Sequence, residues 1–337
     1  MRNTNSLMEN MKLYKGSHPF VDLAGDLAYK KDYSVNSWFY TSRFQVEGQD
    51  ISTLVHLISL NVPGLTPEPV MLCMAAATNE TTGEYYGGSD EALPFSLLQV
   101  SDDKYDIRTP KIAMYGDLDE MHVKAEIYGG AGAIDFTMKA VGWPIFNSGN
   151  AHFPIGLMNV YQYSLPTLST TGTLTLGDKT YEVEGTSWYD RQWQNTPGIM
   201  DAKWAWMNMD MDNGDFISIW DIDFIGGQRR NSFATILKPN GTQMVVPAEP
   251  FGCADVWQSE VSGRSYPTRF TVKIPATDTC LDVVATPRKQ EICSMVDPKY
   301  EGAAAISGVH CGKTATGHCV IELVGEAWKG LPTLPNE

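Results

Sequence analysis

The sequence lacks the features on which several common protein classes depend. No two of its six cysteines stand at the CxxC spacing of metal knuckles and redox motifs, so we expect free thiols. No stretch of the 337 residues approaches the apolar length of a membrane span, and the first twenty lack the apolar core of a signal peptide. These absences predict a cytoplasmic protein without a membrane span.

Positive charge is scarce. The chain carries 25 Lys and Arg residues against 40 Asp and Glu residues, which gives a formal net charge of -15, and the basic residues form no cluster. Because such a surface repels a phosphate backbone, we exclude nucleic acid as a partner.

Cofactor signatures are missing as well. The sequence has no glycine-rich phosphate loop and no GxSxG elbow, and its histidines offer no close metal pair, since even His310 and His318 are eight residues apart. Residues 210–215 resemble a calcium loop, but Gly214 comes one position early and no Glu closes the loop. We therefore expect neither a nucleotide cofactor nor a metal.

What the sequence does contain is the pattern of β-strands. Apolar and polar residues alternate over 171–183 and again over 204–224, which is typical of strands with one buried face. Gly177-Asp178 and Asn213-Gly214 interrupt these runs and predict tight hairpins. No crossover helix separates the strands, so the pattern predicts an all-β protein of antiparallel barrels.

The length favours two domains, because single hydrophobic cores stop growing at about 250–300 residues. A stretch with Pro and Gly, residues 195–198, separates two dense strands. We therefore predict one β-barrel domain over residues 1–196 and a second over residues 197–337.

Three segments carry a resemblance to a known family: SVNSWFYTSRFQVEG (34–48), YQYSLPTLSTTGTLTLGDKTYEVEGTSWYDRQW (161–193) and YEGAAAISGVHCGKTATGHCVIELVG (300–325). They resemble the AttH-like family of carotenoid 1,2-hydratases (hydroxyneurosporene synthases), kievitone hydratase and fungal lipocalin-like Diels-Alderases, although Phe39 stands where a second Trp is usual. The resemblance implies two lipocalin-like antiparallel β-barrel domains with an apolar pocket in or between them. Because a shared fold does not by itself imply a shared reaction, the function depends on the residues of the site.

Asp190 is the first candidate catalytic residue. On a strand, Trp188, Asp190 and Gln192 share one face, whereas Arg191 points to the other. An Asp set among aromatic groups and away from an Arg is expected to stay protonated and to act as a general acid. The resemblance also implies a functional carboxylate at this position. The alternative is a structural carboxylate that accepts backbone N–H groups.

Two further residues are candidates for proton transfer. His56 follows the Trp38 strand at hairpin distance, and we expect it to face the same cavity as Trp38 and Tyr40. Glu322 shares a face with Val320 and Val324 in the second barrel, where we expect it to point inward. For each residue, the alternative is a structural role in the core.

Aromatic residues recur two apart, so each pair lies on one strand face, and such pairs suit a wall for an elongated apolar ligand. The alternative is ordinary packing of a barrel interior or of a homodimer face. Together with two neighbours of Asp190, the predicted substrate-binding residues are Trp38, Tyr40, Tyr161, Tyr163, Trp188, Gln192, Trp204 and Trp206.

Three functions fit these observations. The first is a cofactor-independent hydratase or dehydratase (a hydro-lyase) that acts by acid catalysis on an unsaturated, apolar isoprenoid, flavonoid or polyketide. The second is an isomerase or cyclase of the Diels-Alderase kind, in which the shape of the pocket does the work. The third is a lipocalin-type carrier that releases its apolar ligand unchanged.

Overall fold

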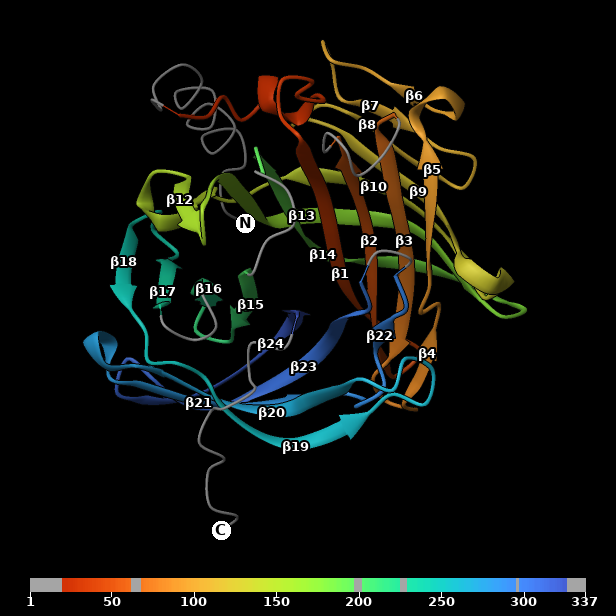
Figure 1. Ribbon diagram of the computed structural model, residues 1–337. Helices are drawn as coiled ribbons and strands as arrows, with labels where there is room; N and C mark the ends of the chain where they lie inside the picture. The colour runs from red at the N-terminus through yellow and green to blue at the C-terminus, as the bar shows by residue number, and fades with distance from the viewer. Residues whose placement is uncertain (1–19, 62–67, 197–201, 225–228, 295–296, 326–337) are drawn as a thin grey trace. The chain divides into compact units, whose positions relative to one another are not determined.

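The structure is a computed structural model that describes residues 20–61, 68–196, 202–224, 229–294 and 297–325 (Figure 1). The chain divides into two compact units, unit 1 (residues 1–199) and unit 2 (residues 200–337). The boundary predicted between residues 196 and 197 lies at the start of a stretch outside the described residues.

Unit 1 contains one curled antiparallel sheet, in which strands that are consecutive in the chain are mostly neighbours (Figure 1). Its strands are β1 (Val35–Val46), β2 (Gln49–Leu60), β3 (Val70–Asn79), β4 (Glu84–Tyr86), β5 (Asp90–Pro94), β6 (Gln99–Val100), β7 (Asp106–Arg108), β8 (Ile112–Gly116), β9 (Met121–Ile127), β10 (Gly132–Ala140), β11 (Ile145–Phe146), β12 (His152–Ile155), β13 (Met158–Leu176) and β14 (Lys179–Gln194). The 3-10 turn η1 (Gly25–Leu27) precedes β1, and three others connect strands: η2 (Phe95–Leu97), η3 (Tyr128–Gly130) and η4 (Asn147–Gly149).

The core of unit 1 lies on one face of this sheet. Alternate residues of β9 and β10 are buried and exposed, as expected for strands with one side against the core and the other in water. In the first ten residues of β1 and in residues 187–194 of β14 most residues are buried, so both faces of these stretches are removed from solvent. This double burial matters for the candidate site.

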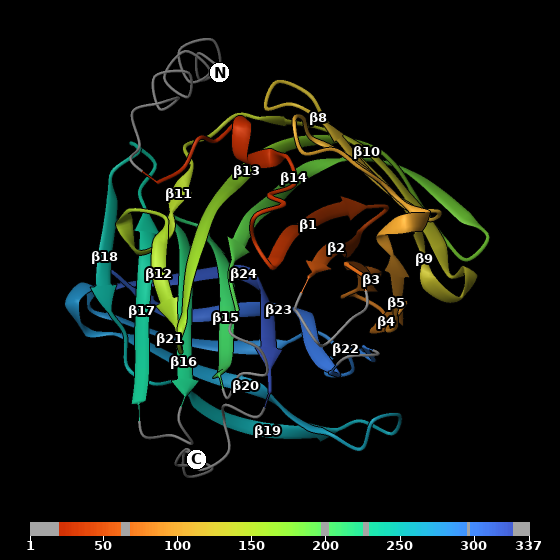
Figure 2. The same ribbon diagram turned by 45° about the horizontal axis from the view of Figure 1, so that its top comes forward.

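Unit 2 contains a second curled antiparallel sheet. Its strands are β15 (Ala202–Met211), β16 (Phe216–Phe224), β17 (Arg229–Leu237), β18 (Gln243–Pro247), β19 (Gly252–Gln258), β20 (Ser265–Ile274), β21 (Thr279–Ala285), β22 (Glu291–Ile292), β23 (Lys299–His310) and β24 (Lys313–Val324), with the 3-10 turn η5 (Pro275–Thr277) between β20 and β21. Figure 2 shows β15, β16 and β17 side by side, and β24 pairs with β15 on the other side. The core packs on the face of Met207, Ile321 and Leu323.

The structure confirms the all-β prediction of two lipocalin-like units. Both predicted hairpins form, because Gly177-Asp178 joins β13 to β14 and Asn213-Gly214 lies in the turn between β15 and β16. All six cysteines are free thiols, as predicted. Among the described residues, no helix is long and apolar enough to cross a membrane.

Candidate active site

Strand β14 carries the candidate site, and its neighbours show which side chains share each of its faces. Asp190 lies opposite Phe39 on β1 and opposite Ser164 on β13. Arg191, one position along, lies opposite Trp38 and Tyr163. Directly opposed residues point to the same side of a sheet, so Asp190 and Arg191 occupy opposite faces, as the sequence predicts.

Arg191 points into the core of unit 1, where it is completely buried. Its guanidinium carbon lies 4.4 Å from the Trp38 ring centroid and 5.1 Å from that of Trp193. It donates to the carbonyl oxygens of Asp26 at 2.6 Å and Ala28 at 2.8 Å, so it holds the segment that leads into β1. Burial lowers the pKa of the guanidinium, but its donors are satisfied. Arg191 is therefore a structural anchor.

Four of the predicted substrate-binding residues lie on this core face with Arg191, and not beside Asp190. Tyr163 donates its hydroxyl to the carbonyl of Leu23 at 2.9 Å, and the Trp38 indole donates to that of Leu27 at 2.8 Å. These contacts fasten the same N-terminal segment. The four residues are Trp38, Tyr40, Tyr161 and Tyr163. Tyr161 packs against the core cluster, and the other three are buried within it.

Asp190 lies on the opposite face of the sheet and is 3 % exposed. Ser164 donates its hydroxyl to Oδ1, and the Gln162 amide donates to the same oxygen at 3.3 Å. The Trp188 indole donates to Oδ2 at 2.8 Å. Three neutral donors directed at the two oxygens therefore fix the orientation of the Asp190 carboxyl group. Its role as a general acid stays a prediction.

A hydrogen bond from Asn147 determines the direction in which the Ser164 hydroxyl donates. Asn147, in the short turn η4, donates its side-chain amide to Ser164 Oγ at 3.2 Å, so the serine hydroxyl is free to donate to Asp190. Beside this chain of hydrogen bonds lie two amide oxygens, Gln162 Oε1 and Asn147 Oδ1. Both are buried and have no hydrogen-bond partner among the described residues. Such oxygens are acceptors for a water or a ligand hydroxyl.

His56 shares the face of Asp190. It lies opposite Phe39 on the neighbouring strand, and its ring meets that of Phe39 edge-on at 4.8 Å. Its Nε2 is 2.8 Å from the hydroxyl of Ser37. The expectation that His56 faces the same cavity as Trp38 and Tyr40 is therefore wrong, because β1 places those two residues on its other side.

A row across three strands connects His56, Phe39 and Asp190. Two strand spacings separate the first from the last, or about 10 Å between backbones. Trp188 and Gln192 belong to the same face, as predicted, and Gln192 donates to the Gln194 side chain at 3.1 Å. Four of the predicted site residues thus lie together on the face of unit 1 opposite its core: His56, Trp188, Asp190 and Gln192.

The sequence analysis missed Gln162, Ser164 and Asn147. Near the hairpin between β13 and β14, Leu176 pairs with Lys179, and further along Leu168 pairs with Ser187. If this pairing continued regularly, Leu165 would lie opposite Asp190. An irregularity between Leu165 and Leu168 shifts the register by one, which brings Ser164 there instead. The polar residues at alternate positions of YQYS were a signal, but this shift was not predictable from them.

In unit 2 the structure brings Glu322, Trp204 and Trp206 together. Glu322 lies opposite Trp206, and the Trp204 indole donates to its Oε1 at 2.6 Å. The Trp206 indole donates to the Ser218 hydroxyl at 2.9 Å. The core of the unit lies on the other face, with Ile321 and Leu323, so the expectation that Glu322 points inward is wrong.

Two charged residues accompany Glu322, and neither was a candidate from the sequence. Glu301 lies opposite Glu322 on β23, and the Lys299 ammonium pairs with the Glu301 carboxylate. Burial raises the pKa of Glu322 to about 7, helped by the negative charge of Glu301 and opposed by Lys299 and the Trp204 hydrogen bond. This carboxyl can exchange a proton near neutral pH.

Most of the chain matches a known protein family. The AttH-like family matches residues 16–326, which is most of the chain. The chain belongs to the AttH-like family. All the predicted site residues of this AttH-like protein lie within the matched range.

Two curated proteins resemble the AttH-like protein at 28% identity. One is kievitone hydratase from Fusarium solani subsp. phaseoli, over 205 residues that make up 58% of each chain. The other is dehydratase asqC from Emericella nidulans, over 206 residues that make up 56% of this chain and 57% of the relative. The chain thus covers less than two thirds of the length of either relative.

A solved structure shows the same fold. The crystal structure of kievitone hydratase from Nectria haematococca superposes with a TM-score of 0.78 at 21% identity, over 93% of this chain and 95% of the other. At this identity the likeness concerns the fold, and the chemistry must come from the residues of the site.

Proposed function

We propose that the AttH-like protein is a cofactor-independent hydratase or dehydratase, a hydro-lyase, with Asp190 as its proton-transfer group. The observation that carries the proposal is the buried Asp190 carboxylate, held by neutral donors from Ser164, Gln162 and Trp188. The names of the two curated relatives, a hydratase and a dehydratase, support the same reaction class.

In the direction of hydration, protonated Asp190 gives its proton to one carbon of the double bond, and a water adds to the cation that forms at the other carbon. The Asp190 carboxylate then takes a proton from the added water, which restores the acid. Dehydration is the reverse, in which Asp190 protonates the hydroxyl group, a water leaves, and the carboxylate takes a proton from the neighbouring carbon as the double bond forms. One residue thus serves as base and acid, and no cofactor is needed.

The neighbours of Asp190 supply the other parts of the reaction. The Trp188 and Phe39 rings on the same face offer aromatic surfaces against which positive charge on carbon is stabilised. The Gln162 and Asn147 oxygens accept hydrogen bonds from the water or the substrate hydroxyl. His56 is a second proton carrier, about two strand spacings away.

For the substrate we propose an unsaturated, mostly apolar small molecule of the isoprenoid, flavonoid or polyketide kind. The kievitone hydratase relative supports this class, and kievitone is therefore the first compound to assay. A cytoplasmic location and a homodimer stay predictions.

The test uses water labelled with oxygen-18. The protein is incubated with kievitone and with a panel of prenylated flavonoids, terpenoids and polyketides, and the products are weighed by mass spectrometry. A product heavier by one labelled water (hydration) or lighter by one water (dehydration), absent with Asp190→Asn and present with Asp135→Asn, supports the proposal; Asp135 is an exposed carboxylate of the same unit. A product of unchanged mass indicates an isomerase or cyclase, and recovery of every compound unaltered indicates a carrier.

A further inference from the structure

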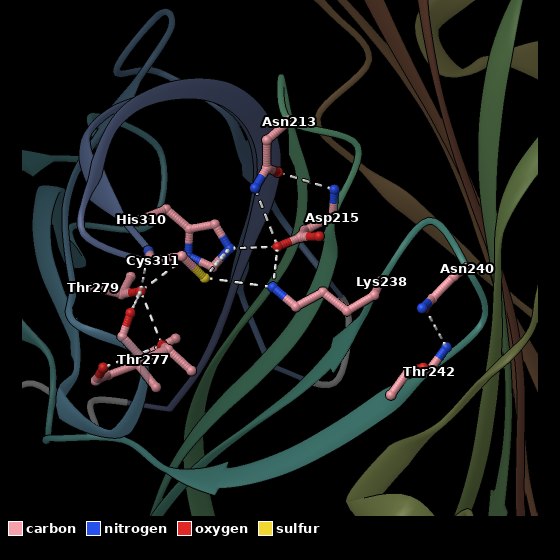
Figure 3. A network of polar contacts seen from close by, with 10 residues as sticks. Asn213, Asp215, Lys238, Asn240, Thr242, Thr277, Thr279, His310 and Cys311 are labelled. Atoms are coloured by element: carbon pink, nitrogen blue, oxygen red, sulfur yellow. Dashed lines mark hydrogen bonds and ion pairs between the residues drawn. The ribbon is translucent and has the colours of Figure 1, made fainter.

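A second polar cluster lies in unit 2 at the ends of four strands, and the proposed reaction does not use it. Asp215 comes from the turn before β16, Lys238 follows β17, Thr279 begins β21, and His310 with Cys311 ends β23. Figure 3 shows these side chains converging on one another.

Asp215 is the centre of the cluster and is 2 % exposed. Its Oδ2 lies 2.6 Å from Lys238 Nζ and 2.7 Å from His310 Nε2, and Asn213 donates to it at 3.2 Å (Figure 3). Burial raises the pKa of Asp215, but the hydrogen bonds from Lys238 and His310 outweigh it and leave the pKa below its usual value. Asp215 is therefore an anion that holds two cationic or donating groups in place.

Cys311 stands at the accessible edge of this arrangement. Its Sγ lies 3.4 Å from Lys238 Nζ and 3.6 Å from His310 Nε2, and the residue is exposed. A thiolate, rather than a thiol, is the reactive form of cysteine, and a neighbouring ammonium group stabilises it. Lys238 is held by Asp215, so its ammonium group stays within hydrogen-bond reach of the sulfur.

The backbone places Cys311 where a cysteine is unusual. Cys311 has φ +53° and Gly312 has φ +72°, in the turn that joins β23 to β24. Hairpin turns with two positive φ values favour Asn or Asp before Gly. The thiol therefore stands at this position at some cost in local conformational energy.

The hydrogen bonds of His310 exclude two other interpretations. Its Nε2 faces the ionised Asp215 and must carry a proton to donate there, while Nδ1 meets the Thr279 hydroxyl at 2.9 Å. A protonated Nε2 cannot take the proton of Cys311, so the group is not a catalytic triad. A metal ion bound by Asp215, His310 and Cys311 would need the same nitrogen and would meet the Lys238 ammonium.

We propose that Cys311 is a modification site that undergoes thiol–disulfide exchange with low-molecular-weight disulfides, promoted by Lys238. The Cys311 thiolate attacks one sulfur of the disulfide and forms a mixed disulfide, while the sulfur–sulfur bond breaks. The released thiolate takes a proton from water. Cysteine is oxidised and the incoming disulfide is reduced, so no further oxidant is required.

The experiment measures the rate at which oxidised glutathione modifies the full-length protein, followed by mass spectrometry and peptide mapping. Cys280 is the internal control, because it is also exposed and its thiol has no hydrogen-bond partner within the described parts of the chain. We expect Cys311 to react about tenfold faster than Cys280. Lys238→Met should slow Cys311 about five- to tenfold, and Lys238→Arg should keep the rate within about twofold of the wild type.

Thermal melting and the number of modified thiols distinguish a change in the reactivity of Cys311 from a loss of folding. An unfolded variant also exposes the buried Cys73, Cys253 and Cys319. Should Lys238→Met not fold, the comparison of Cys311 with Cys280 in the wild type decides. Equal rates at these two cysteines, or an unchanged rate at Cys311 in folded Lys238→Met, would overturn the proposal. Protection of Cys311 by one equivalent of zinc ion would also overturn it, in favour of a metal site.

Discussion

Asp190 in unit 1 and Glu322 in unit 2 have similar positions but different surroundings. Each lies on the face of its sheet opposite the core, and each accepts a hydrogen bond from a tryptophan indole, Trp188 or Trp204. The other contacts of Asp190 described above are neutral, whereas Glu322 stands beside the charged residues Glu301 and Lys299. Among the contacts described above, neighbouring charge is the main difference between the two carboxyl groups.

This difference teaches that two buried carboxyl groups with a similar tryptophan contact can stand in different electrostatic surroundings. The neutral donors described above orient the Asp190 carboxyl group. Burial and a second carboxylate across the strands make ionisation of Glu322 unfavourable, so Glu322 retains a proton to higher pH. Burial and neighbouring charge, rather than the tryptophan contact common to both residues, therefore raise the pKa of Glu322.

The largest effect is expected from Asp190→Asn. An amide cannot exchange a proton, so kcat/KM should fall by roughly a factor of 1000. The amide N–H of the new side chain would also face the Trp188 donor, which should cost about 1 kcal/mol of stability. Product formation and thermal melting measure the two effects.

The matched variant is Glu322→Gln, which removes the carboxyl group of unit 2. Because the proposed function assigns proton transfer to Asp190, the kcat/KM of Glu322→Gln should fall much less. Full turnover by Asp190→Asn, or equal losses in both variants, would contradict the assignment of Asp190.

The next largest effect is expected from Arg191→Met, on the other face of β14. The substitution leaves carbonyl oxygens of Asp26, Ala28, Ser37 and Gln192 without their donor, so the free energy of unfolding should fall by about 3 kcal/mol. Urea unfolding measures the loss, and limited proteolysis should reveal earlier cleavage within residues 20–31. Unchanged stability would show that the core face does not depend on this anchor.

The pH dependence of stability should distinguish Glu322 from other carboxyl groups. Its pKa in the folded protein is about 7, above the ordinary value of 4.5, so the folded state binds a proton that the unfolded state has lost. The free energy of unfolding should therefore decrease as the pH rises from about 5 to 8. Glu322→Gln should remove about 2 kcal/mol of this decrease, measured by urea unfolding at several pH values.

Glu249→Gln is the control for this titration, because Glu249 is an exposed glutamate of the same unit. It should leave the pH dependence as in the wild type. If the free energy of unfolding of Glu322→Gln still decreased between about pH 5 and 8 as in the wild type, the titration would belong to another group.

The smallest effect is expected from Ser164→Ala, which removes one donor to Asp190. The loss of one hydrogen bond should lower kcat/KM about tenfold while Asp190 stays in place. Ser187→Ala is the matched control, because Ser187 is equally buried and pairs with Ser42 and Thr170 instead. Similar activity losses in both variants would show that the hydroxyl of Ser164 has no special role.

The sequence by itself determined the strands, the two hairpins and the opposite orientations of Asp190 and Arg191. Each follows from local geometry, since side chains of a strand alternate and Gly-containing dipeptides allow the backbone of a tight turn. The pairs Trp38 with Tyr40 and Tyr161 with Tyr163 share their faces for the same reason.

Tertiary structure alone decided which face became the core and which residues meet at the site. Alternation is symmetric, so it does not tell whether Asp190 or Arg191 points inward; the curl of the sheet settles that choice. The register shift between Leu165 and Leu168 decided that Ser164 meets Asp190, and the pairing of β1 with β2 placed His56 beside Phe39. These contacts join residues far apart in the chain, and their register depends on the packing of whole strands.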